Sequence, residues 1–294
     1  MTSQTGTVAP AGNSYAPDQA TIDRLRERAQ FIRLETVRLI DIAKTGHYTS
    51  VFSAAEVFSA LYYDVMNLRK GEPKWEERDR FTIGKGHAAV GLFPIYADLG
   101  FFPTEWLDDY TRLGSPLGDH PDMRKVPGVD FSSGSIGHAL SNAIGIALAQ
   151  RWTGKHYSVF CMMGDGEMQE GQVWEAALFA AQNKLGRLIG IIDRNGFQLD
   201  GRVDDVMAIE PLDEKWRAFG WEVHIVDGHD IAAVTELLRR LRADDTRNQP
   251  AMVISKTLKG RGVSYMETEP GWHLGWLDPS DADEAIAEIK SQVI

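Results

Sequence analysis

Two short apolar segments that end in polar, glycine-containing motifs constrain the fold of this chain more than any other feature. Residues 157–163 end directly in Gly164-Asp165-Gly166, and residues 188–192 end in Asp193-Arg194-Asn195-Gly196. The residues between them, 169–185, have the pattern of a helix, so the unit is predicted to be strand, helix, strand. Strands joined in this way run parallel, and both motifs therefore lie at the edge where open α/β sheets bind ligands.

These two motifs carry the groups that a magnesium-diphosphate site needs. Asp165 supplies a carboxylate and Asn195 an amide oxygen, ligands that suit a hard cation with coordination positions left for phosphate and water. Gly164 and Gly166 have no side chains, so their backbone N–H groups can approach an anion closely. A purely structural role is also open, with Asp165 capping the next helix and Asn195 occupying a turn. The surrounding sequence favours the magnesium-diphosphate site.

Residues 164–201 resemble the thiamine diphosphate motif of transketolases. The resemblance rests on Gly164-Asp165-Gly166, Glu170-Gly171, Glu175-Ala176-Ala177, Lys184-Leu185-Gly186, Asn195-Gly196-Phe197 and Asp200-Gly201. Loops elsewhere resemble the same family: Thr45-Gly46-His47, Gly84-Lys85-Gly86-His87-Ala88, Gly118-Asp119-His120-Pro121, Pro127-Gly128-Val129 with Ser133-Gly134-Ser135-Ile136-Gly137, and Trp272-His273 after the segment 256–262. The resemblance extends over residues 20–280.

The resemblance implies a role for individual residues of this chain. Mg²⁺ would be bound by Asp165, Asn195 and the backbone carbonyl of Phe197. Thiamine diphosphate would be contacted by His87, Gly134, Ile136, Gly164, Gly166, Glu167, Asn195, Leu199 and His273. The catalytic residues facing the substrate would be His47, His87, His120 and His273, because imidazoles can polarise or deprotonate sugar hydroxyls near neutral pH. Without the resemblance, each histidine would be read as a structural hydrogen-bonding group.

Three glutamates after the Gly-Asp-Gly motif need separate treatment. Glu170 and Glu175 match family positions near the subunit interface, where a proton network links paired active sites. Glu167 and Glu170 also suit a helix N-terminus, where the helix dipole favours negative charge. We favour this helix-terminus role for Glu167 and the interface role for Glu175, whose alanine-rich helix is expected to be buried.

Only half of a transketolase is expected in this chain of 294 residues. In full-length transketolases a second domain supplies the glutamate that activates the cofactor, the pyrimidine clamp and most sugar-phosphate arginines. The resemblance therefore implies the N-terminal subunit of a split transketolase, with an α2β2 assembly as the simplest arrangement. With its partner chain it would transfer a two-carbon ketol unit from a ketose or ketose phosphate to an aldose acceptor.

Charge and composition exclude several other classes of protein. The formal net charge of −11 argues against general binding to nucleic acid or to a membrane surface. No apolar run is long enough to cross a bilayer, and Cys161 is the single cysteine, so a disulfide framework is excluded. We expect a cytoplasmic protein with a flexible tail over residues 1–18, rich in small residues and Pro and lacking any basic residue.

The expected fold for residues 19–294 is a single α/β domain, an open and mostly parallel sheet with helices on both faces. Further strands are predicted over residues 221–226 and 251–255. Helices are predicted over residues 20–44, 53–66, 86–99, 138–152 and 231–241, and from residue 280 onwards. Ser53 and Glu56 form a Ser-x-x-Glu pattern that predicts a capping box at the start of the second helix.

Three alternatives stay open. The α subunit of a 2-oxo-acid dehydrogenase shares the Gly-Asp-Gly and Asn motifs but lacks the histidine loops. A deoxyxylulose-phosphate synthase relative and a non-catalytic cofactor-binding partner are the others. The chain departs from the transketolase pattern at His47-Tyr48-Thr49-Ser50, at Ser133-Gly134-Ser135-Ile136-Gly137-His138 and at Leu274-Gly275-Trp276. These departures leave the donor and acceptor sugars open.

Overall fold

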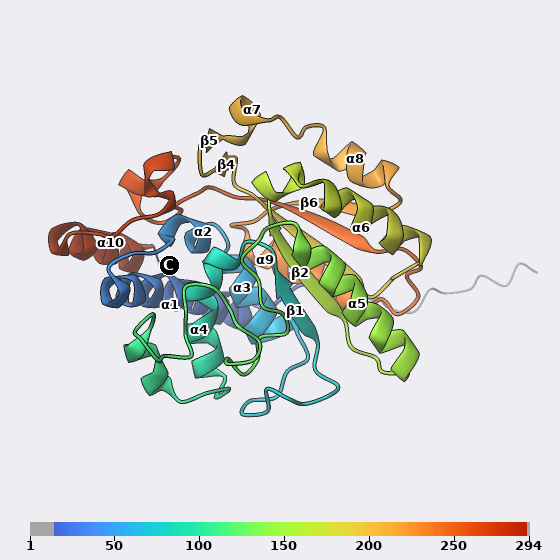
Figure 1. Ribbon diagram of the computed structural model, residues 1–294, viewed down its shortest axis with the longest axis horizontal. Helices are drawn as coiled ribbons and strands as arrows, with labels where there is room; N and C mark the ends of the chain where they lie inside the picture. The colour runs from blue at the N-terminus through green and yellow to red at the C-terminus, as the bar shows by residue number, and fades with distance from the viewer. Residues whose placement is uncertain (1–14, 293–294) are drawn as a thin grey trace, which may run out of the picture.

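A five-stranded parallel sheet forms the centre of the protein (Figure 1), as described for residues 15–292 by a computed structural model. The strand order is β1-β2-β3-β7-β6, and every pairing within it is parallel. The strands are β1 (Arg80–Ile83), β2 (Val159–Gly164), β3 (Leu188–Arg194), β6 (Glu222–Asp227) and β7 (Ala251–Lys256). A small antiparallel pair, β4 (Phe197–Gln198) and β5 (Gly201–Arg202), follows β3.

Helices precede and connect these strands. They are α1 (Gln19–Ala43), α2 (Tyr48–Phe52), α3 (Ala55–Ala60), α4 (Ala89–Asp98), α5 (His138–Thr153), α6 (Gly171–Gln182), α7 (Val203–Val206), α8 (Leu212–Ala218), α9 (Ile231–Ala243) and α10 (Pro279–Ser291). A π-helical turn, Leu61–Val65, continues α3. Short 3-10 turns occupy Gly86–Ala88, Thr104–Asp109, Gly166–Gln169, Ser264–Met266 and Pro270–His273.

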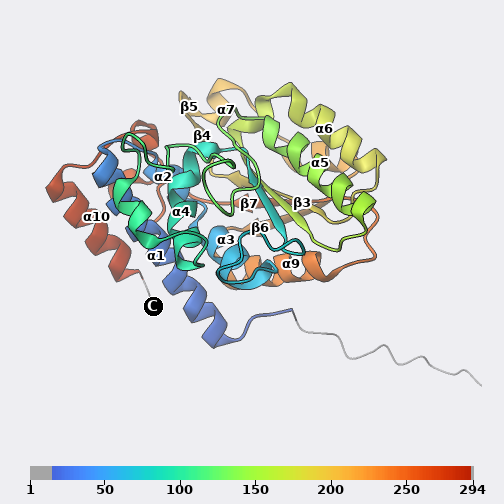
Figure 2. The ribbon, with the colours of Figure 1, turned by 60° about the horizontal axis from the view of Figure 1, so that its bottom comes forward.

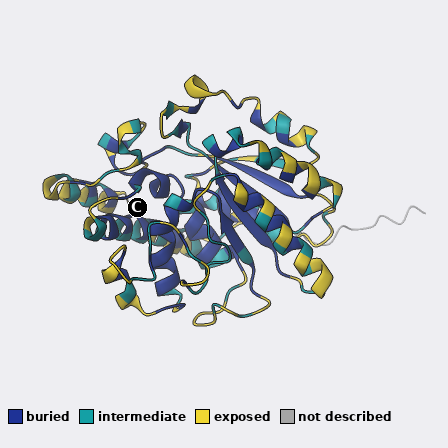
Figure 3. Cartoon of the chain, viewed as in Figure 1, coloured by how far each residue is buried: buried dark blue, intermediate teal, exposed yellow. Residues whose placement is uncertain are grey.

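Two apolar cores hold the helices against opposite faces of the sheet. Along β2, Phe160 and Met162 belong to the core that includes residues of α1, α3, α4 and α9, whereas Cys161 and Met163 belong to the core with α5, α6 and α8. Successive side chains of a strand point to opposite faces, so a strand covered on both sides is apolar throughout. The predicted open parallel sheet with helices on both faces is confirmed (Figure 2). Strands β1, β2, β3 and β7 are mostly buried (Figure 3), whereas the edge strand β6 is partly exposed.

Two details of the sequence-based prediction are wrong. Strand β1 was not predicted, because its four residues are too few to show a periodicity. The capping box does not form: the Ser53 hydroxyl donates to Asp193 Oδ2 at 2.7 Å, and Glu56 accepts from Arg33 at 2.7 Å. Both side chains take buried partners far away in sequence. The predicted helix over 53–66 is itself present, as α3 and the π-helical turn that continues it.

Most of the expected tail, residues 1–18, lies outside the described residues. In its described part, Asp18 accepts from the Thr21 N–H at 2.9 Å and so caps α1, and Arg239 donates to the Tyr15 carbonyl at 3.3 Å. The described part of the expected domain, residues 19–292, is built around the five-stranded sheet. Within residues 15–292, none of the helices has the length and apolar character needed to traverse a bilayer.

Candidate active site

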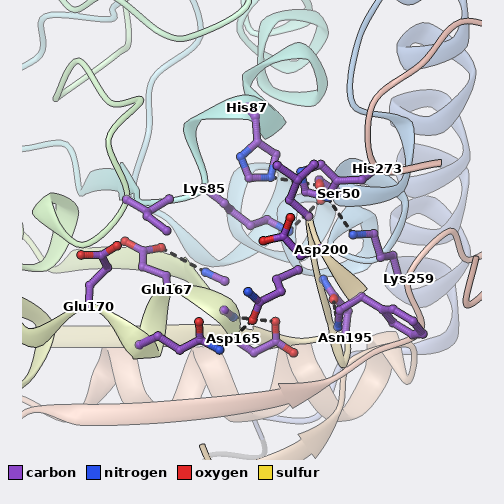
Figure 4. A pocket seen from close by; sticks show the side chains of 17 residues that line it. Ser50, Lys85, His87, Asp165, Glu167, Glu170, Asn195, Asp200, Lys259 and His273 are labelled. Atoms are coloured by element: carbon purple, nitrogen blue, oxygen red, sulfur yellow. Dashed lines mark hydrogen bonds between the residues drawn. The ribbon is translucent and has the colours of Figure 1, made fainter. Parts of the chain in front are cut away.

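A cavity of about 410 Å³ opens at the carboxyl edge of the sheet, where β2 and β3 end (Figure 4). Its wall is built from the loop after β1, the Gly-Asp-Gly turn, the exit of β3 and the loops after β7. The residues predicted from sequence that line it are His87, Ile136, Gly164, Asp165, Gly166, Glu167, Glu170, Asn195, Phe197, Leu199 and His273. The fold thus brings together segments far apart in the chain, as expected for a parallel sheet.

Asp165 is buried and firmly held at one side of this cavity. Its Oδ2 accepts from the Gly196 N–H at 2.6 Å and from Arg194 Nη1 at 3.0 Å, and its Oδ1 accepts from the Gly166 N–H at 2.9 Å. Gly196 reaches this position with a φ of +84°, a conformation that favours glycine. Burial raises the pKa of Asp165 to about 6.

Asn195 is oriented by a buried ion pair. Burial alone would raise the pKa of Asp193, but the Lys85 ammonium holds it below its ordinary value, and the two side chains form an ion pair. The ionised Asp193 can only accept, so Asn195 turns its Nδ2 to Asp193 Oδ2 at 3.0 Å. Asn195 Oδ1 is then left as an acceptor, and the Phe197 N–H donates to it at 3.1 Å.

The oxygen atoms that these residues offer are suitable ligands for a hard cation. Asp165, Asn195 and Phe197 line one cavity and offer a carboxylate, an amide oxygen and a backbone carbonyl, a set that leaves coordination positions for phosphate oxygens and water. In the part of the chain that the structure describes, no group of three or more His, Cys, Asp or Glu side chains is placed to bind a metal ion. The mixed oxygen set around Asp165 is the candidate Mg²⁺ site on the strength of its own ligand groups.

Lys259 gives the other side of the cavity a positive charge. Its side chain is only 1% exposed, and among the described residues it has no ion pair with a carboxylate. Lys259 Nζ donates to His273 Nδ1 at 2.8 Å, and burial lowers the pKa of Lys259 to about 8. A buried ammonium without a counter-ion is unfavourable, and an anion bound in the cavity would compensate it.

Three histidines cluster beside this lysine. The ring centroids of His47, His87 and His273 lie 4.9 to 5.4 Å apart. Burial lowers the pKa of His273 to about 3 and that of His87 well below its ordinary value, so both rings are neutral at pH 7. Because Lys259 only donates, His273 Nδ1 is the acceptor and the ring proton lies on Nε2.

A further polar contact orients His87, whereas one ring nitrogen of His47 is without a hydrogen-bond partner among the described residues. His87 Nε2 lies 3.0 Å from the Ser50 hydroxyl. His47 Nδ1 is buried without a hydrogen-bond partner among the described residues, and it faces Asp119 Oδ1 at 3.7 Å. His47 is therefore the cluster member with an unused polar atom.

Other predicted residues lie outside the cavity wall. The side chain of His120 is 41% exposed, and its Nδ1 lies 3.3 Å from Asp119 Oδ2. Gly134 is beside it, since a Cβ on Gly134 would lie 3.4 Å from His120 Cδ2. Both residues flank the histidine cluster, and their predicted catalytic and cofactor-binding roles stay predictions.

The expectation that the alanine-rich helix is buried holds for one side of α6 only. Helix α6 buries its Val173, Ala176, Ala177 and Ala180 side, and Glu175 lies on the exposed side with Leu178 and Phe179. The small alanines face the sheet because they allow close packing there. The role of Glu175 at an interface stays a prediction.

Glu167 joins three segments of the site. Its Oε1 accepts from the Gly137 N–H at 2.7 Å, just before α5, and its Oε2 accepts from the Gly164 N–H at 3.2 Å. A side chain on Gly84, in the loop after β1, would overlap the Glu167 carboxylate. Burial raises the pKa of Glu167 to about 7. Its negative end thus faces the N-terminus of α5, and contact with a cofactor stays a prediction.

Sequence reasoning missed several lining residues, namely Ser50, Lys85, Gln169, Gln198, Asp200 and Lys259. For the two lysines, the sequence contains a pattern from which their place in the site could have been predicted. Lys85 stands between two glycines directly before His87, and Lys259 precedes Gly260 in a glycine-rich segment. A lysine in a glycine-rich loop after a strand is typical of anion sites, and the motif would have identified both.

The comparisons with known proteins agree with this geometry. The family model described as "Transketolase, thiamine diphosphate binding domain" matches residues 25–292. The chain is 37% identical over 268 residues to the 6-deoxy-6-sulfo-D-fructose transketolase subunit SqwG of Clostridium sp. (strain MSTE9), covering 91% of this chain and 97% of that protein. It is 37% identical over 277 residues to one of the apulose-4-phosphate transketolase subunits of Actinobacillus succinogenes, covering 94% and 99%.

Single-chain transketolases match over less than half of their length. Rat transketolase is 36% identical over 280 residues, which cover 95% of this chain and 44% of the rat enzyme. A solved structure of a Pichia stipitis transketolase mutant superposes with a TM-score of 0.83 at 26% identity, covering 90% of this chain and 40% of that one. The Campylobacter jejuni enzyme gives 0.83 at 25% identity, covering 94% and 43%.

These relatives favour the transketolase interpretation over a 2-oxo-acid dehydrogenase subunit. The match to relatives named as subunits covers nearly their whole length, whereas the match to rat transketolase covers 44% of that enzyme. The cavity carries the carboxylate, amide, lysine and histidine groups at the expected edge of the sheet. The chain therefore belongs to the family of transketolase thiamine diphosphate-binding domains, and its extent is that of the separately encoded subunits.

Proposed function

We propose that this chain is the diphosphate-binding subunit of a two-chain transketolase that transfers a two-carbon ketol unit from a ketose or ketose phosphate to an aldose acceptor. One observation carries the proposal: the buried Lys259, with no carboxylate partner among the described residues, shares a cavity with the oxygen pair of Asp165 and Asn195. A cation site beside an uncompensated positive charge is what a magnesium diphosphate requires.

The cavity residues divide into those that bind the metal and those that bind the cofactor. Asp165, Asn195 and the Phe197 carbonyl would hold Mg²⁺. Lys259, His87, His273 and the Gly166 N–H would hold the diphosphate, with Ile136 and Leu199 packed on the thiazolium. When bound, thiamine diphosphate supplies the carbon nucleophile of the reaction. The chain contributes positioning and exclusion of water, which lower the barrier without any covalent role of its own.

Proton handling falls to the histidines. Neutral His273, with its proton on Nε2, would donate a hydrogen bond to an oxygen in the cavity. Among the described residues the buried His47 Nδ1 has no hydrogen-bond partner, so it could bind a sugar hydroxyl beside Asp119. His120, more exposed and beside Asp119, would bind the sugar further from the cofactor.

The proposed assembly is supported by the relatives that are named as transketolase subunits and are covered over nearly their whole length. The pyrimidine-binding domain would come from a C-terminal transketolase subunit, most simply in an α2β2 heterotetramer. The exposed side of α6, with Glu175, Leu178 and Phe179, supports an interface between subunits there, with Glu170 and Glu175 in its proton network. We place the enzyme in the cytoplasm on the strength of its acidic composition and its single, buried cysteine.

Reconstitution with the partner chain tests the proposal. The neighbouring reading frame's product is copurified with this chain and assayed for thiamine diphosphate- and Mg²⁺-dependent ketol transfer from a panel of ketose phosphates. We expect activity only when both chains are present and its loss in Asp165→Ala. Asp283→Ala, on the exposed surface of α10, is the matched control and should keep full activity. Turnover by this chain alone would contradict the two-chain assignment, and turnover of 2-oxo acids would contradict the reaction.

A further inference from the structure

The side chain of Arg194, at the carboxyl end of β3, is shared by three carboxylates. Its Nη1 donates to Asp165 Oδ2 at 3.0 Å, its Nη2 to Asp204 Oδ1 at 3.1 Å and its Nε to Glu210 Oε1 at 3.1 Å. Only 13% of the side chain is exposed. Each nitrogen of the guanidinium serves a different carboxylate, which the planar fork of arginine permits and a lysine ammonium does not reproduce.

These contacts fix one oxygen of the candidate metal ligand. Asp165 Oδ2 receives both Arg194 and the Gly196 N–H, so its two lone pairs are occupied. Oδ1 receives a single donor, the Gly166 N–H at 2.9 Å, and keeps one lone pair. The carboxylate therefore cannot exchange its oxygens without breaking two hydrogen bonds, and Oδ1 is the oxygen left to bind a cation.

The other two carboxylates hold Arg194 in place and offset its charge. The side chains of Asp204, in α7, and Glu210, before α8, are 46% and 52% exposed, whereas that of Asp165 is 1% exposed. Three carboxylates surround one guanidinium, so the local sum of charges stays negative. Arg194 can thus orient Asp165 without making the cation site electropositive.

We propose that Arg194 is a positioning residue for the divalent cation: it presents Asp165 Oδ1 to the metal and is itself anchored by Asp204 and Glu210. This inference rests on the proposed function, because it assigns a role toward Mg²⁺. Hydrogen-bond partners of metal ligands typically affect metal affinity by about 10–100-fold when removed. Loss of the Arg194 guanidinium should weaken cation binding by at least about 10-fold on that scale.

The affinity of the full chain for Mn²⁺, a paramagnetic substitute for Mg²⁺, tests this proposal. Mn²⁺ is titrated in the presence of saturating thiamine diphosphate, and the free ion is followed by electron paramagnetic resonance. We expect Arg194→Met to raise the Kd by about 10-fold or more, and Arg194→Lys to restore only part of the affinity. The Asp204→Asn/Glu210→Gln double variant keeps the guanidinium but loses its anchors, so a smaller rise in Kd is expected. Arg217→Met, which breaks an ion pair within α8, should leave the Kd unchanged.

The outcomes separate this inference from the proposed function. An Arg194→Met protein that binds Mn²⁺ as tightly as the wild type, or more tightly, overturns the positioning role. A wild-type chain whose Mn²⁺ binding is no tighter than that of Asp165→Ala overturns the metal site itself. Circular dichroism and thermal melting report whether each variant is folded. If Arg194→Met does not fold, the double variant decides, because it alters only partly exposed carboxylates.

Discussion

At the scale of single residues, burial decides which groups of the cavity carry charge. Lys259 Nζ is hydrogen-bonded to His273 Nδ1. Burial lowers the pKa of the lysine to about 8 and that of the histidine to about 3. At pH 7 the lysine is therefore still protonated and the histidine is neutral. This pairing gives the cavity one positive charge and one fixed N–H donor.

Nitrogen chemical shifts should report the tautomer of His273 directly. In ¹⁵N-histidine-labelled protein at pH 7, His273 should show an unprotonated Nδ1 and a protonated Nε2, because Lys259 can only donate to Nδ1. Its shifts should stay constant between pH 5 and 7, since burial lowers the pKa of His273 to about 3. A titration midpoint near the ordinary histidine value would contradict this arrangement. The signals of His273 are assigned as those that disappear from the spectrum of the His273→Gln variant.

Replacing Lys259 should stabilise the protein while weakening cofactor binding. The depressed pKa, about 8 against 10.5, means that burying the ammonium costs about 3 kcal/mol at pH 7. Lys259→Met removes this cost and should raise the free energy of unfolding. From pH 8 to 10.5 only the unfolded state holds the proton, so the wild type is stabilised and the advantage of the variant fades.

Urea denaturation of both proteins at pH 7 and at pH 10 measures this difference. Lys256→Met, an exposed lysine at the end of β7, is the control and should show no such pH dependence. If the difference in the free energy of unfolding between Lys259→Met and the wild type grew with pH, the predicted direction of the pH dependence would be wrong.

At the scale of elements, the loop after β1 leaves no room for a side chain at Gly84. Glu167 sits between the loop after β1, the start of α5 and the Gly-Asp-Gly turn, and it accepts N–H groups from two of these segments. Gly84 makes room for its carboxylate, since a side chain there would overlap it. The close approach of the three segments depends on this glycine.

Gly84→Ala should therefore destabilise the fold. Overpacking at a buried contact typically costs about 1–3 kcal/mol, and the added methyl group would push Glu167 away from the Gly137 N–H. Urea denaturation measures the loss. Gly171→Ala is the matched control: a Cβ there meets nothing within 4 Å, and alanine at a helix start should leave stability unchanged or slightly higher. Equal stability of the two variants would contradict the packing argument.

At the scale of the whole molecule, one helix face is left uncovered. Leu178 and Phe179 are exposed on α6 next to Glu175, while the opposite side of this helix packs on the sheet. Exposed apolar side chains grouped on one face are typical of interaction sites. This observation is independent of the cavity and supports the proposed assembly.

A charge on this face should dissociate the assembly without unfolding the chain. Phe179→Arg is expected to shift the purified complex to smaller species in sedimentation velocity and to leave the melting temperature of this chain unchanged. Leu113→Arg is the control, because Leu113 is also exposed but lies in a turn outside α6. An unchanged sedimentation coefficient for Phe179→Arg would place the interface elsewhere.

Local patterns in the sequence were enough to predict the central unit of the fold and the oxygen ligands of the candidate site. The apolar segments that became β2 and β3, and the helical pattern between them, are local signals that no distant contact reverses. Asp165 and Asn195 could be placed together from sequence, because parallel strands end at the same edge of the sheet. The family resemblance added the histidines, of which His87 and His273 line the cavity.

Only the tertiary structure decided which partner each buried polar group takes. Ser53 binds Asp193 instead of capping a helix, Lys259 pairs with His273, and Arg194 joins Asp165 to two carboxylates. These pairs form because a polar group removed from water needs a partner, and the nearest one in space is seldom the nearest in sequence. For the same reason the exposure of Glu175 could not be inferred: the side of α6 that packs on the sheet depends on the sheet itself.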